Sequence, residues 1–137
     1  MRGVSEQLID RTRLAQVRAE LGANFQRVLG YYREDGEKTI AQIEEAMRDR
    51  SAVALVRPAH TLKGESLQFG AEPLGLAAER IEKAARRAVE ARNFPDAVLI
   101  DVVSLRELFT NTLAAFDEAV PAPAPPRRTF GFGRKVA

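Results

Sequence analysis

The single histidine of this 137-residue chain, His60, has the clearest potential for chemistry. Lys63 follows it by three residues and Gly64 by four, so the three share one face if the segment is helical. A neutral imidazole is a good nucleophile and is well populated near neutral pH. The lysine would disfavour the imidazolium and would stabilise an anionic group once attached to the ring. Because no second catalytic group stands beside it, such a histidine suits carriage of a group better than hydrolysis.

The surroundings of His60 indicate a surface that another molecule approaches. A glycine in the middle of a helix costs about 1 kcal/mol relative to alanine. Close approach of another backbone is a common reason to keep Gly64 there. Val56 and Leu67 fall on the same face and would place apolar groups around the imidazole. An ordinary exposed histidine beside a neutral glycine is the plainer alternative.

The helix that would hold His60 extends over about residues 52–69, with Ser51 as its N-cap and Gly70 as its stop. Its inward stripe, at steps of four and three, consists of Leu55, Ala59, Leu62, Ser66 and Phe69. His60 is one residue off this stripe, or about 100° around the helix. We therefore expect its ring on the flank of the protein and not in the core.

The rest of the chain repeats this helical periodicity and shows no sustained alternation of a strand. Helices are predicted over about 11–21, 24–50, 73–92 and from after Pro95 to 119. Gly30 and Gly36 would permit a kink in the second of them. Short turns between long amphipathic helices predict an all-α fold, an antiparallel up-down four-helix bundle with a short N-terminal accessory helix.

Composition limits the classes of function. The chain has 45% hydrophobic residues and 29% charged residues, typical of a globular domain. It has no cysteine, which excludes disulfides and thiolate sites, and one histidine excludes a histidine-rich metal centre. No stretch is apolar enough for a membrane span, and the N-terminus lacks the apolar region of a signal peptide. We expect a cytoplasmic protein.

The chain divides into a bundle, residues 1–120, and a Pro/Ala-rich linker with a basic tail, residues 121–137, expected to be flexible. The tail holds four of the 21 basic residues and none of the 19 acidic ones. The bundle is thus mildly acidic, with 17 basic residues against 19 acidic ones, so we do not expect the domain to bind nucleic acid.

The segment around His60 resembles the signature of the histidine-containing phosphotransfer (HPt) domain family, and the resemblance covers about residues 8–118. The matching segments are Ala59-His60-Thr61-Leu62-Lys63-Gly64, Phe69-Gly70-Ala71 with Leu74, Leu21-Gly22-Ala23-Asn24-Phe25 and Glu79-Arg80-Ile81-Glu82. The resemblance implies a four-helix bundle that passes phosphoryl groups between receiver-domain aspartates.

By this resemblance His60 would be the phosphoacceptor, reacting through its outward ring nitrogen, Lys63 would support the phosphoryl oxygens, and Gly64 would leave room for the receiver. Glu82 would lie against the imidazole, with Arg86 at the edge of the docking face. The partners implied are response regulator receiver domains and a hybrid histidine kinase, and the carrier would be a monomer. The Mg²⁺ of transfer would belong to the receiver, so no cofactor or metal is expected on this chain, which also lacks a P-loop for ATP.

Two residues depart from the family pattern. Glu65 stands where a small residue is usual. We place it with Val56, Leu67, Glu82 and Arg86 among the partner-binding residues, and it would oppose a phosphohistidine unless it faces away or pairs with Arg86 or the partner. Pro58 removes a helical amide and should kink the helix or restrict where it begins. Glu65 keeps a second function open, a helical adaptor that binds a receiver or kinase through the face around His60, without phosphorylation. A phosphoacceptor domain of a chemotaxis-type kinase would share the chemistry of the carrier.

Overall fold

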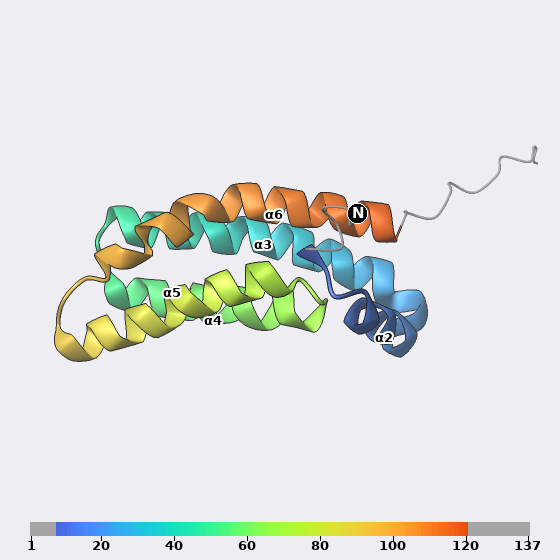
Figure 1. Ribbon diagram of the computed structural model, residues 1–137, viewed down its shortest axis with the longest axis horizontal. Coiled ribbons are helices and arrows are strands. Elements are labelled where there is room, and N and C mark those ends of the chain that lie inside the picture. The colour runs from blue at the N-terminus through green and yellow to red at the C-terminus, as the bar shows by residue number, and fades with distance from the viewer. Residues whose placement is uncertain (1–7, 121–137) are drawn as a thin grey trace, which may run out of the picture.

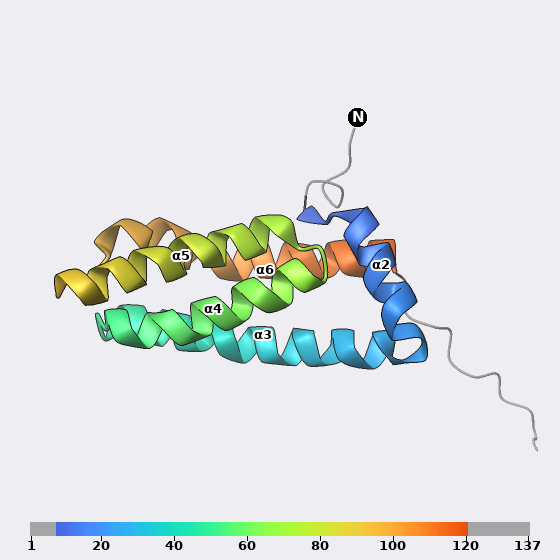
Figure 2. The same cartoon turned by 90° about the horizontal axis from the view of Figure 1, so that it is seen from below.

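The computed structural model describes residues 8–120, which contain helices and no strand. The α-helices are α2 (Arg11–Leu21), α3 (Phe25–Arg48), α4 (Ala52–Gln68), α5 (Glu72–Ala91) and α6 (Leu99–Ala119). Two 3₁₀ helices, Gly22–Asn24 and Asp96–Val98, precede α3 and α6. Helices α3 to α6 form an antiparallel bundle, and α2 lies across one end of it (Figures 1 and 2). The predicted all-α bundle with an accessory helix is confirmed, whereas the proposed tail lies outside the described residues.

The helix ends follow from local chemistry. The carboxylate of Asp10 accepts a hydrogen bond from the Arg13 amide at 3.1 Å and caps α2. The hydroxyl of Ser51 does the same for α4, accepting from the Ala54 amide at 3.1 Å. Gly70 ends the α4 region with φ of 84°, and a Cβ there would lie 2.7 Å from the Asp10 carbonyl oxygen. Only glycine therefore fits the turn that also docks the N-terminal segment.

The core lies between the four long helices, with α4 packed against α3 and α5, and α6 packed on the other side against the same two helices. The predicted inward stripe of α4 is entirely buried. At its end Phe69 packs against the rings of Phe25, Tyr32 and Phe116 at centroid distances of 5.3–6.2 Å. Each such buried ring contributes about 1.5–3 kcal/mol to folding. The burial of Ala59 determines that its neighbour, His60, lies on the flank.

Two helices pass through residues expected to disturb them. Helix α3 is continuous through Gly30 and Gly36, where the sequence permitted a kink. Gly36 instead makes space for a side chain, because a Cβ there would lie 2.5 Å from Cζ of Phe109. Helix α4 remains helical on both sides of Pro58, whose ring is buried. None of the helices within residues 8–120 is long and apolar enough to cross a bilayer.

Candidate functional site

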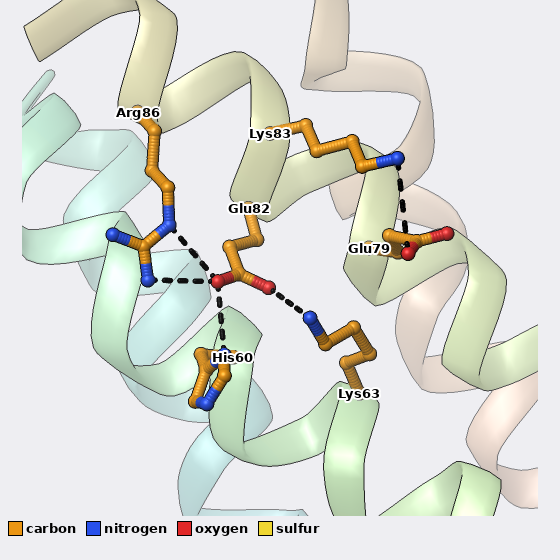
Figure 3. Close-up of polar contacts among 6 residues, drawn as sticks. All are labelled: His60, Lys63, Glu79, Glu82, Lys83 and Arg86. Atoms are coloured by element: carbon orange, nitrogen blue, oxygen red, sulfur yellow. Dashed lines mark hydrogen bonds and ion pairs between the residues drawn. The ribbon is translucent and has the colours of Figure 1, made fainter.

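The imidazole of His60 lies at the surface between α4 and α5, with 59% of its side chain exposed (Figure 3). This confirms the position expected from the helical phase of α4. From the neighbouring helix, the carboxylate of Glu82 reaches under the ring, and its Oε2 lies 2.9 Å from His60 Nδ1. The side chain of Glu82 is only 6% exposed. Glu82 therefore contacts the imidazole, as the resemblance implied, and offers little surface to a partner.

Glu82 is also paired with two cations. Lys63 Nζ lies 2.8 Å from Oε1, and Arg86 donates to Oε2 from Nη2 at 2.8 Å and from Nε at 3.0 Å. Burial by itself would raise the pKa of Glu82, but the hydrogen bonds from Lys63, Arg86 and His60 outweigh it and lower the pKa to about 2. The carboxylate is thus ionised at neutral pH.

An ionised carboxylate only accepts hydrogen bonds, so the bond to His60 determines the tautomer of the ring. Nδ1 carries the proton and donates a hydrogen bond to Glu82 Oε2. Nε2 therefore holds the free lone pair, and Figure 3 shows it on the side of the ring turned away from Glu82. The arrangement is an exposed nucleophilic nitrogen with a buried, charge-neutralised carboxylate behind the ring.

Stability should fall in acid because of Glu82. A pKa of about 2 in the folded protein, against the ordinary 4.5, gives stability that is complete above pH 4.5 and is lost as the pH falls toward 2. The full shift corresponds to about 3 kcal/mol, of which about 2 kcal/mol is lost between pH 7 and pH 3. Urea unfolding at both pH values measures this loss, and Glu82→Gln should lose about 2 kcal/mol less than wild type. Equal losses in the two proteins would contradict the role of the carboxylate.

Gly64, Val56 and Leu67 lie around the imidazole as predicted, but each in a different setting. Gly64 is exposed, and a Cβ there would meet nothing within 4 Å. Leu67 is 37% exposed and is held against α5, where a Cβ on Gly75 would lie 2.5 Å from Leu67 Cδ2. Val56 is half-buried. The packing of this chain therefore does not require a glycine at position 64, whereas a Cβ at position 75 would displace the side chain of Leu67.

A groove of about 500 Å³ between α4 and α5 adjoins the histidine on the side of Val56. Its lining consists of Val53, Val56, Arg57, Arg86, Val89 and Glu90. Arg57 has no hydrogen bond or ion pair within residues 8–120, so its charge is available to a ligand. Sequence reasoning missed Val53, Arg57 and Val89, although Val53 and Arg57 precede His60 by seven and three residues on the same helical face.

The structure separates Glu65 from this group, which corrects its placement on the partner-binding face. Five residues after His60, it lies about 140° around the helix, on the side toward α3. Its neighbours there are Asp35 and Tyr32, and burial together with the charge of Asp35 raises the pKa of Glu65. The conflict between an acid and a phosphohistidine therefore does not arise, because Glu65 faces away. It makes no pair with Arg86, which binds Glu82.

No three histidine or carboxylate side chains within residues 8–120 are grouped in a way that could hold a metal ion. The structure brings together four residues of the predicted site. His60 supplies the nucleophilic nitrogen, and the charges of Glu82, Lys63 and Arg86 lie beside its ring.

Comparison with known proteins agrees with this architecture. The structure is similar to the crystal structure of histidine-containing phosphotransfer protein B (HptB) from Pseudomonas aeruginosa PAO1, with a TM-score of 0.70 and 22% sequence identity. The match covers 85% of this chain and 97% of that one. No curated protein matches the sequence. The Hpt domain family matches residues 27–119, from α3 to the end of α6. The chain therefore belongs to the Hpt domain family, the histidine phosphotransfer domains of phosphorelays.

Proposed function

We propose that the protein is a phosphocarrier of a multistep two-component relay, with His60 as the residue that is phosphorylated. The observation that carries the proposal is the hydrogen bond of His60 Nδ1 to the ionised Glu82, which leaves the exposed Nε2 as the nucleophile. Nε2 would attack the phosphorus of an aspartyl phosphate on a receiver domain. The bond between phosphorus and the aspartate oxygen would break, and the carboxylate would leave with the electron pair.

Charges around His60 favour attachment of a phosphoryl group to the ring. Positive charge develops on the ring as Nε2 bonds to phosphorus, and Glu82 lies at Nδ1 to stabilise it. Lys63 and Arg86 more than balance the charge of Glu82, so a phosphoryl group meets a site with a net positive charge. Lys63, whose side chain is 24% exposed, has access to turn toward phosphoryl oxygens. The Mg²⁺ needed by the reaction would be held by the receiver.

The docking surface for the receiver would be the α4–α5 face. It combines Val56, Leu67 and the exposed Gly64 with the groove that contains Arg57. Such a surface fits an apolar patch flanked by acidic groups. We propose response regulator receiver domains, including the receiver of a hybrid histidine kinase, as donor and acceptor.

The experiment that tests this function is phosphotransfer from a panel of receiver domains of the same cell. Each receiver is labelled with phosphate, mixed with the full chain, and the label is followed over time. Rapid appearance of acid-labile, base-stable label with one or two receivers supports a carrier and names its partners. Binding without label, unaffected by His60→Gln, favours the adaptor instead.

Gly64→Ala should make the protein more stable and a poorer carrier. The methyl group meets nothing within the chain, so the helix gains about 0.5–1 kcal/mol from the better helix former. A receiver that packs on this backbone would be held away, and we expect transfer to slow by about 10-fold, equivalent to about 1.4 kcal/mol.

Gly30→Ala is the matched control, because Gly30 is also inside a helix with open space around it. It should give a similar gain in urea unfolding with an unchanged transfer rate. If both variants transfer at the wild-type rate, the receiver does not approach Gly64.

The groove can be tested with two valines of nearly equal exposure. Val53, 69% exposed, lines the groove beside His60, whereas Val103, 67% exposed, lies in a separate hollow between α3 and α6. Val53→Glu removes apolar surface and adds an acid where an acidic partner is expected. We expect it to raise the half-saturating receiver concentration by about 10-fold. Val103→Glu should leave it unchanged, and equal effects of the two would remove the groove from the docking surface.

A further inference from the structure

Three N–H groups converge on one oxygen of Glu82. Oε2 accepts from His60 Nδ1 at 2.9 Å and from Nη2 and Nε of Arg86 at 2.8 and 3.0 Å. Lys63 is paired with the other oxygen, Oε1, at 2.8 Å. The oxygen that orients the imidazole is therefore the one that Arg86 holds.

Arg86 and Lys63 constrain the carboxylate differently. A guanidinium presents its N–H groups in a rigid fork, so two bonds to one oxygen define both the distance and the direction of that oxygen. The ammonium of Lys63 is a rotatable point charge and leaves the carboxylate free to turn about its axis. Arg86 is also one helical turn after Glu82 on α5, which presents its fork to that side chain.

We propose that Arg86 is a positioning residue for phosphoryl transfer: by fixing Glu82 Oε2 against Nδ1, it holds the His60 ring in the tautomer whose lone pair is on the exposed Nε2. The tautomer exists in the free protein, and only its use in transfer rests on the proposed function. This role differs from contact with a partner at the edge of the docking face, which the family resemblance implied for Arg86.

Arg86 matters for the step because attack on phosphorus requires the lone pair on Nε2 and the proton on Nδ1. Nε2 forms the bond to phosphorus, the donor's own bond to phosphorus breaks, and the donor group leaves with that electron pair. Nδ1 keeps its proton throughout, and the ring becomes positively charged beside Oε2. If the proton were on Nε2 instead, it would have to leave before attack, because the lone pair would be on the nitrogen that faces Glu82.

Nitrogen NMR of the full chain reads the tautomer directly, because the chain has one histidine and hence only two ring nitrogens. Spectra are recorded at about pH 8.5, where imidazole is neutral. Wild type should show a protonated Nδ1 and an unprotonated Nε2. In Arg86→Gln we expect both signals to move toward an average of the two tautomers, with Arg86→Lys intermediate because lysine keeps the charge without the fork.

Arg87→Gln is the matched control. Arg87 is the next residue on α5, is exposed, and has no hydrogen bond or ion pair within residues 8–120. It should give the wild-type spectrum. Identical spectra for wild type and Arg86→Gln would overturn the proposal, as would equal changes in Arg86→Gln and Arg87→Gln, which would indicate charge alone. Thermal unfolding verifies that all variants are folded.

A small phosphoryl donor separates this proposal from the choice of partner. Phosphoramidate transfers its phosphoryl group to imidazole and releases ammonia, with no receiver present. We expect phosphorylation at Nε2 to be about 2-fold slower in Arg86→Gln than in wild type or Arg87→Gln, because averaging leaves about half of the rings in the reactive tautomer, and an unchanged rate would overturn the positioning role. The two proposals can fail separately. If no receiver labels the chain, the relay function is wrong, but a tautomer that changes in Arg86→Gln still shows that Arg86 positions the ring.

Discussion

His60→Gln should take up no phosphoryl group from any receiver that labels the wild-type protein. The nitrogen of a glutamine amide has no available lone pair, so the N–P bond cannot form. Because 59% of the His60 side chain is exposed and it makes one side-chain hydrogen bond, the free energy of unfolding should change by at most about 1 kcal/mol. Label transfer and urea unfolding, measured on the same preparation, test both expectations.

The amide nitrogen of glutamine matches the position of Nε2 and not that of Nδ1, so the variant loses the bond to Glu82, while the ion pairs of Glu82 with Lys63 and Arg86 keep those side chains in place. Binding of a receiver should therefore persist while transfer disappears. Label on His60→Gln would place the phosphoryl group on another residue and refute the assignment of His60.

Glu82→Gln should have the second largest effect, a loss of about 10- to 100-fold in the rate of transfer. The amide has the same shape but no charge, so the ring loses a charge-assisted hydrogen bond worth about 1.5–3 kcal/mol, which corresponds to that range of rates. Lys63 and Arg86 would also be left facing each other without the anion between them. Single-turnover transfer from a saturating labelled receiver measures the chemical step.

Glu79→Gln is the control for this substitution. Glu79 lies on α5 one turn before Glu82, and its ion pair with Lys83 is long, at 3.8 Å, and more exposed (Figure 3). Such a pair contributes little, so transfer and stability should match wild type. A Glu82→Gln protein that transfers at the wild-type rate would show that charge behind the ring is not needed.

Much of the scaffold could be read from local pattern. The spacing of Leu55, Ala59 and Leu62 predicted both the buried face of α4 and the flank on which His60 lies. The cap at Ser51 was recognisable because a cap depends on residues within one turn. Gly36 was misleading, since its local propensity favours a break, whereas packing against Phe109 accompanies a continuous α3. Helix α4 extends from Ala52 to Gln68 with Pro58 inside it.

The site was less predictable, because its contacts join two helices. The resemblance pointed to Glu82 beside the imidazole, but spacing alone does not tell which acid of α5 reaches α4. Nor does it tell that Arg86 binds this acid or that Glu65 faces α3. The groove that contains Arg57 was not predictable from one helix either, because α4 supplies one of its walls and α5 the other.

The sequence by itself determined the helical bundle, because short turns join long amphipathic helices. It also determined the exposure of His60 and the presence of Lys63 and Gly64 on its face, since these follow from the period of one helix. Only the tertiary structure decided that Glu82 lies under the ring between Lys63 and Arg86. That pairing depends on the rotation and axial offset of α4 against α5, where the bare backbone of Gly75 accepts Leu67. Such offsets arise from close packing between distant residues, so the tautomer of His60 is a property of the folded chain.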